Sequence, residues 1–132
     1  MQNSIFGGCL CGQIQFEAKE PTNIHSCSCA ICQKHTGSQA AVWIEFQAAN
    51  VKWIGEGGKP AIYRSSDYSS RAFCSQCGSS IGAIDDAPTV ALLTGIINKS
   101  SDMEIILESH SFADEAPCWW RRYFSYNTLS KD

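Results

Sequence analysis

This chain has little charge and no long apolar run, and both deficits narrow its possible functions. Charged residues make up 17% of the 132 residues, and the formal net charge is −3. This composition argues against a nucleic-acid-binding protein, because such proteins concentrate lysine and arginine on one surface. No apolar segment approaches the roughly 20 residues that span a bilayer. We therefore expect a protein that binds neither nucleic acid nor a membrane.

The N-terminal residues also lack the features of an export signal. Residues 1–8 have neither a basic start nor an apolar core, so we expect no signal peptide. The sequence has no internal repeat, low-complexity segment or obvious linker. Its length is that of one domain, which buries roughly two-thirds of its unfolded surface without needing a metal. We predict a single cytoplasmic domain over residues 1–132.

What the chain has in abundance is cysteine. Seven of its eight cysteines lie in three short clusters, which are Cys9 and Cys11; Cys27, Cys29 and Cys32; and Cys74 and Cys77. Glycine follows the first and third clusters, as expected where the backbone folds tightly around an ion and the next residue has φ > 0. Tetrahedral zinc takes four thiolates, typically from two short pairs far apart in sequence. The first and third clusters are therefore predicted to form one structural zinc site.

The middle cluster is one ligand short of a closed site. Three protein ligands with an open fourth position are typical of a catalytic zinc, so Cys27, Cys29 and Cys32 are predicted to hold a second, functional zinc. His35 follows Cys32 by three residues and is the alternative: as a fourth ligand it would close the site and make this zinc structural as well. We expect two zinc ions per chain.

Two other uses of cysteine compete with zinc. An even number of cysteines permits a disulfide framework, but a chain without an export signal stays in a reducing compartment. A redox role for Cys29 and Cys32 requires a βαβ context, and the sequence shows none. Zinc binding is therefore the preferred interpretation, and a thiol redox or zinc-storage protein remains an alternative.

Hydrophobic periodicity indicates a mainly β fold. Apolar residues alternate with polar ones, as Val42, Ile44 and Phe46 do with Trp43 and Glu45 on the opposite face. Short strands are expected at 13–17, 42–46, 51–53, 61–63, 80–84, 90–97 and 103–112. One helix is expected after Cys29, ending near Gly37, and another from Asp114, carrying Trp119, Trp120, Tyr123 and Phe124. Many short strands separated by turns predict antiparallel sheets folded over one another.

Four motifs, taken in order, resemble a known family. They are Gly8-Cys9-Leu10-Cys11-Gly12; Cys27-Ser28-Cys29-Ala30-Ile31-Cys32-Gln33 with Thr36-Gly37; Tyr63-Arg64-Ser65-Ser66; and Arg71-Ala72-Phe73-Cys74-Ser75-Gln76-Cys77-Gly78. This succession resembles the glutathione-dependent formaldehyde-activating enzyme family, which includes centromere protein V and has the Mss4-like fold. The resemblance implies two stacked β-sheets with zinc knuckles at strand turns. It also implies a structural zinc on Cys9, Cys11, Cys74 and Cys77, and a functional zinc on the middle cluster.

The activity that the resemblance implies is a carbon–sulfur lyase reaction, which in the synthetic direction joins formaldehyde and glutathione as S-hydroxymethylglutathione. The residues support this chemistry independently. A thiol that binds an open zinc position loses its proton and becomes nucleophilic, and an aldehyde is the matching electrophile. A small thiol such as glutathione and an aldehyde are therefore the expected partners. A non-catalytic Mss4-like zinc-binding or interaction module is the alternative.

The remaining candidates have weaker support. His25 and His110 are possible proton relays, or ordinary hydrogen-bonded histidines. Arg71 is a candidate to hold a substrate carboxylate, or a strand-end contact. Tryptophans 119 and 120 are expected in the core or in a homodimer contact. Cys118, the eighth cysteine, is expected to be a small buried hydrophobic residue.

Overall fold

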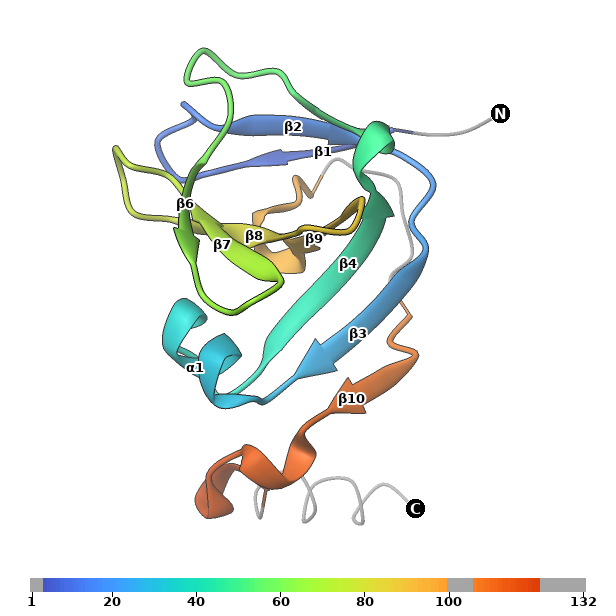
Figure 1. Cartoon of the computed structure of the whole chain (residues 1–132), viewed down its shortest axis with the longest axis vertical. Helices are drawn as coiled ribbons and strands as arrows, with labels where there is room; N and C mark the ends of the chain where they lie inside the picture. The colour runs from blue at the N-terminus through green and yellow to red at the C-terminus, as the bar shows by residue number, and fades with distance from the viewer. Residues whose placement is uncertain (1–3, 100–105, 122–132) are drawn as a thin grey trace.

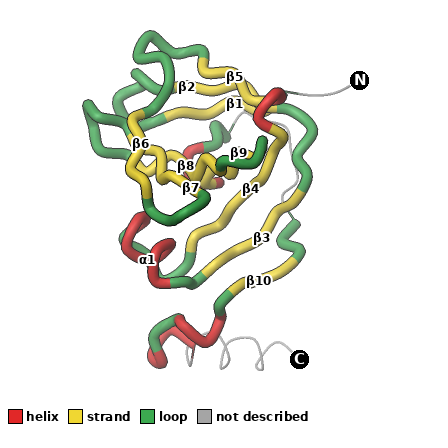
Figure 2. The backbone as a smooth tube through the Cα atoms, viewed as in Figure 1, coloured by secondary structure: helices red, strands yellow, loops and turns green. Residues whose placement is uncertain are grey.

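The computed structural model shows two β-sheets that pack against each other (Figure 1) and describes residues 4–99 and 106–121. The strands are β1 (Ile5–Gly8), β2 (Gln15–Ala18), β3 (Asn23–Cys27), β4 (Ala41–Gln47), β5 (Val51–Trp53), β6 (Ala61–Arg64), β7 (Ser69–Phe73), β8 (Ser80–Asp85), β9 (Thr89–Leu93) and β10 (Ser109–Ser111). The helix α1 spans Ala30–Thr36, and 3-10 turns lie at Ala48–Asn50, Thr94–Ile96 and Ala113–Glu115. Figure 2 shows how small the helical share is.

The order of the strands explains how distant parts of the chain meet. The smaller sheet has the order β1-β2-β5 and the larger one β10-β3-β4-β9-β8-β7-β6. Neighbouring strands are antiparallel except for β10, which pairs in parallel with β3. The larger sheet therefore places β3 and β4 beside one another, and β9 and β8 lie between β4 and β7.

The main core lies between the two sheets. Phe16 of β2 packs in one cluster with Ile44 and Phe46 of β4 and Leu92 of β9, and all four are almost fully buried. Each such side chain contributes roughly 1.5–3 kcal/mol to stability through its burial. Gly7 lets β1 approach the 3-10 turn after β9, because a Cβ there would lie 2.2 Å from the carbonyl oxygen of Ile96. The predicted mainly β fold with two stacked sheets is confirmed.

The other face of the larger sheet carries a second, smaller cluster. Trp43, on the face of β4 opposite Ile44, packs with Cys27, Cys32 and Leu93. The helix α1 follows β3 directly and lies beside this face (Figure 1). The alternation in β4 thus divides its side chains between the core and a separate face, which is the face that holds the candidate site.

Several element boundaries differ from the sequence-based expectations. The strand expected at 90–97 ends at Leu93, where a 3-10 turn begins. The expected strand at 103–112 is short, because β10 covers only Ser109–Ser111, and residues 103–105 lie outside the described residues. From Asp114 onward the chain forms a 3-10 turn and a helical turn at 118–121, whereas Tyr123 and Phe124 lie outside the described residues. The helix after Cys29 is confirmed, with Gly37 as its left-handed C-cap.

Candidate metal centres and active-site cleft

The first and third cysteine clusters meet in space. Cys9 and Cys11 lie in the turn between β1 and β2, and Cys74 and Cys77 lie in the turn between β7 and β8. The four sulfur atoms all lie within 4.8 Å of one another. The Sγ of Cys11 is 3.6 Å from that of Cys9 and 3.8 Å from that of Cys74. This group joins a turn of the smaller sheet to a turn of the larger one and can hold a metal ion.

The backbone around this four-cysteine group is shaped to support thiolates. The amide of Ile14 donates to the Sγ of Cys9 at 3.3 Å, and the amide of Gln76 donates to that of Cys74 at 3.4 Å. Amide donors stabilise the negative form of sulfur. Gly12 and Gly78 have φ values of 83° and 78°, as the spacing of cysteine and glycine predicts.

The middle cluster forms a second group at the junction of β3 and α1. The sulfurs of Cys27, Cys29 and Cys32 also lie within 4.8 Å of one another. Cys27 is the last residue of β3, Cys29 is the N-cap of α1, and Cys32 lies in the first turn of that helix. The amides of Cys29 and Cys32 donate to the sulfurs of Cys27 and Cys29, at 3.5 and 3.3 Å. This triplet can hold a metal ion with three protein ligands.

Deprotonating Cys27 of the triplet requires a nearby positive charge. Burial raises the pKa of the Cys27 thiol to about 12. A thiol with that pKa is a thiolate at neutral pH only when a cation takes the place of its proton. Binding of a metal to the triplet is therefore expected to release protons.

A cavity of about 460 Å³ opens onto the triplet; we call it the triplet cavity. Its floor follows one row of paired residues across four strands: Arg71 of β7 pairs with Ala83, Ala83 with Ala91, and Ala91 with Glu45 of β4. The two alanines have short side chains, so the sheet is hollow between the arginine and the glutamate. The remaining wall residues include His25, Trp43, Ser65, Ser66, Tyr68, Asp85, Phe112 and Glu115.

Arg71 places a cation beside the triplet. Both of its terminal nitrogens lie 3.6 Å from the Sγ of Cys32, and its guanidinium lies 5.2 Å from the centre of the Trp43 ring. The expectation of a strand-end contact is wrong, because Arg71 lies in the middle of β7 and reaches across the sheet to α1. Short-range spacing carries no signal for this contact, which depends on the order of the strands.

His35 lies outside the sulfur triplet. Its ring stacks on Trp43 with 6.3 Å between ring centres, and its Nδ1 is 3.4 Å from a terminal nitrogen of Arg71. Burial, together with the positive charge of Arg71, lowers the pKa of His35 below its usual value, so the ring is neutral at pH 7. The group of candidate metal ligands at this site consists of the three triplet sulfurs and does not include His35.

Replacing His35 tests directly whether it closes the second site. We expect His35→Gln to leave the visible spectrum of the cobalt-loaded protein unchanged, because its nitrogens are not part of the triplet. Elemental analysis of the same variant should show as much metal as the unmodified protein. A spectral shift with loss of one metal ion would establish His35 as a ligand.

The other two histidines lie in different environments. His25 borders the triplet cavity, and its Nδ1 is 3.3 Å from the carboxylate of Glu45. His110 of β10 contacts the hydroxyl of Ser26 through Nδ1, and its Nε2 lies 3.1 Å from the hydroxyl of Ser28. His110 borders a different cavity, so His25 is the better placed of the two for proton transfer near the triplet.

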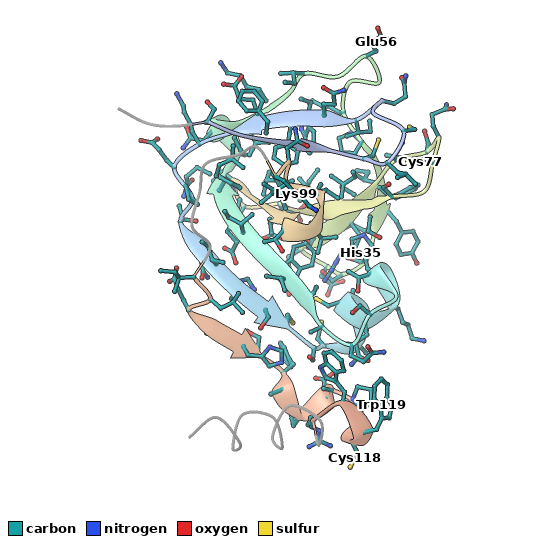
Figure 3. The ribbon with its side chains drawn as sticks, turned by 180° about the vertical axis from the view of Figure 1, so that it is seen from behind. His35, Glu56, Cys77, Lys99, Cys118 and Trp119 are labelled. Carbon is teal, nitrogen blue, oxygen red and sulfur yellow. The ribbon has the colours of Figure 1, made fainter. Side chains whose placement is uncertain are left out.

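Cys118, near the C-terminal end of the described chain, belongs to neither cysteine group. Cys118 is exposed, so the expectation of a buried hydrophobic residue is wrong. Figure 3 shows Cys118 and Trp119 near one end of the long axis and Cys77 towards the other. Trp119 is also exposed and packs edge to face with Trp120. Among the described residues, no helix is both long and apolar enough to cross a membrane.

Comparison with known proteins agrees with this arrangement. The family model described as glutathione-dependent formaldehyde-activating enzyme matches residues 4–119. The chain belongs to this family. A crystal structure of a Rhodobacter sphaeroides protein superposes with a TM-score of 0.58 and 18% sequence identity, covering 80% of this chain and 98% of that one. At this identity the likeness shows a shared fold. No curated protein matches the sequence.

Both cysteine groups lie within the part of the chain that matches the family. The match covers all seven clustered cysteines. Trp43 and Glu45, which border the triplet cavity, were not identified as site residues from the sequence, and neither was Lys34, which lines an adjoining cavity. The alternation in β4 placed Trp43 and Glu45 on a common face, which is the one signal that pointed towards them.

Proposed function

We propose that this protein is a zinc-dependent carbon–sulfur lyase that forms and cleaves adducts between a small thiol and an aldehyde. The single observation that supports this proposal most is the sulfur triplet at the edge of a cavity of about 460 Å³. A site with three protein ligands beside a cavity leaves room for a substrate, which a purely structural site does not need. A small thiol such as glutathione and an aldehyde are the proposed substrates.

The donor atoms fit zinc. With zinc–sulfur bonds of about 2.3 Å, the sulfurs of a tetrahedral site lie about 3.8 Å apart. The spacings of 3.6 and 3.8 Å around Cys11 match this value. Cys9, Cys11, Cys74 and Cys77 would hold the structural ion, and Cys27, Cys29 and Cys32 the functional one. Zinc bound at the triplet would lower the pKa of a substrate thiol so that it reacts as a thiolate.

The residues around the triplet supply the rest of the chemistry. Arg71 places a positive charge beside Cys32 and so offsets the negative charge of three thiolates. His25, held near Glu45, is placed to accept the proton of the incoming thiol. The thiolate sulfur then forms a bond with the carbonyl carbon, the π pair moves to oxygen, and His25 returns the proton to that oxygen. The reverse sequence cleaves the adduct, and neither direction involves oxidation or reduction.

Exchange kinetics test this function. Glutathione and ¹³C-formaldehyde form their adduct spontaneously, so the readout is the exchange rate measured by NMR, which the protein should raise in proportion to its concentration. Equilibrium concentrations should stay the same. An exchange rate that is unchanged over a range of protein concentrations would contradict the proposal and favour a non-catalytic binding module.

A further inference from the structure

A second cavity adjoins the triplet cavity and carries charge of the opposite sign. This side cavity has a volume of about 470 Å³, and its walls include Lys34, His35, Tyr63, Arg71, Phe73 and Ser80. It shares Ile31, Ser65 and Arg71 with the triplet cavity. A molecule whose sulfur lies at the triplet can therefore extend past Arg71 into the side cavity.

The charges of the two cavities differ. Among the described residues, the side cavity is lined by the cations Lys34 and Arg71 and by no carboxylate. The triplet cavity is lined by Glu45, Asp85 and Glu115 in addition to Arg71. A negatively charged group on the substrate is repelled by those carboxylates and by the cysteine sulfurs, and is attracted to the side cavity.

The cations of the side cavity have no carboxylate partner among the residues that the structure describes, although Arg71 also faces the Cys32 sulfur. Neither Lys34 nor Arg71 forms an ion pair with a carboxylate in the described part of the chain. Nε of Arg71, which is buried beside this cavity, also has no hydrogen-bond partner among the described residues. Two cations without a carboxylate partner and an unsatisfied guanidinium nitrogen at one cavity indicate a site for a polar, anionic ligand.

We propose that the side cavity binds a carboxylate of the thiol substrate through Lys34 and Arg71. The preferred substrate class is thus a thiol that carries a carboxylate a few bonds from its sulfur, and the cavity orients that substrate while its sulfur lies at the triplet. This inference rests on the proposed function.

Three short thiols of different charge test the inference. They are 3-mercaptopropionate, which is negative, 3-mercaptopropanol, which is neutral, and cysteamine, which is positive. Each is titrated into the cobalt-loaded protein, and the change in its visible spectrum gives a dissociation constant. Each thiol is compared between the unmodified protein and a Lys34 variant, so that differences in the acidity of the thiols cancel. Lys34 is exposed, so its replacement should leave the fold intact.

We expect Lys34→Gln to weaken binding of 3-mercaptopropionate about threefold to fivefold, and Lys34→Glu to weaken it roughly tenfold. Binding of 3-mercaptopropanol should not change, and Lys34→Glu should strengthen binding of cysteamine. Lys52→Gln is the matched control, because Lys52 is exposed on β5 of the smaller sheet and borders neither cavity.

Three results would overturn the inference, and they show whether the proposed function fails with it. Equal weakening of all three thiols by Lys34→Gln, or equal effects of Lys34→Gln and Lys52→Gln on 3-mercaptopropionate, would refute the carboxylate site and leave the proposed function standing. A spectrum that no thiol alters would refute the proposed function and this inference together.

Discussion

The Cys9→Ser variant is expected to be mostly unfolded at 25 °C. Cys9 lies in the turn between β1 and β2, and its sulfur group includes Cys74 and Cys77 from the turn between β7 and β8. A metal held there joins the two sheets across the core that they enclose. Metal binding at such a structural site contributes a free energy of the same order as the 5–15 kcal/mol that stabilises a whole domain. Serine is a poor zinc ligand, so the variant loses most of this contribution.

Circular dichroism and thermal unfolding measure the effect. Cys77→Ser should behave in the same way, since it removes a ligand of the same ion. Cys118→Ser is the matched control, because it makes the same chemical change at an exposed cysteine outside both groups, and its unfolding temperature should not change. If Cys9→Ser unfolds at the temperature of the unmodified protein, the four-cysteine group does not hold a structural metal.

The Cys29→Ser variant is expected to remain folded and to lose its second metal ion together with the catalysed exchange. Cys29 is the N-cap of α1, where its sulfur accepts a hydrogen bond from the amide of Cys32. Serine is among the preferred residues at this position, so the helix keeps its cap. The triplet keeps only two sulfur ligands, however, and these are too few for a stable zinc site. This substitution therefore separates the functional site from the fold.

Elemental analysis and NMR exchange measure this second effect. The metal content should fall from two ions per chain to one, and the exchange rate should fall to the spontaneous rate. The unfolding temperature should stay close to that of the unmodified protein. Unfolding as severe as that of Cys9→Ser would show that the triplet is a structural site as well.

Much of the fold could be predicted from local patterns, and the missed strands share a physical cause. The alternation of Val42, Ile44 and Phe46 predicted β4 and the division of its two faces. The strands β1, β3 and β7 were not predicted, because Ile-Phe-Gly-Gly, Asn-Ile-His-Ser-Cys and Ser-Ser-Arg-Ala-Phe contain too few alternating apolar residues. The strands β3 and β7 have neighbours on both sides, and β1 pairs with β2. Their strand conformation follows from that pairing more than from their own β-propensity.

The cysteine groups were predictable for a different reason. Cysteines one or two residues apart place two sulfurs close together through backbone geometry alone, and the φ values of Gly12 and Gly78 agree with the tight turns that this requires. The grouping of Cys9 and Cys11 with Cys74 and Cys77 followed from the number of ligands that zinc takes. The sequence therefore contained the two groups, but not their surroundings.

The sequence by itself determined the two sulfur groups and the β class, because cysteine spacing, the number of ligands that zinc takes and the alternation of apolar residues can all be read from it. Only the tertiary structure decided what faces the triplet. Arg71 reaches Cys32 because β8 and β9 lie between β7 and β4, and because Ala83 and Ala91 leave a hollow in that row of the sheet. The cations of the side cavity come from α1 and β7. Strand order and register are set by packing over the whole core, so no local pattern contains them.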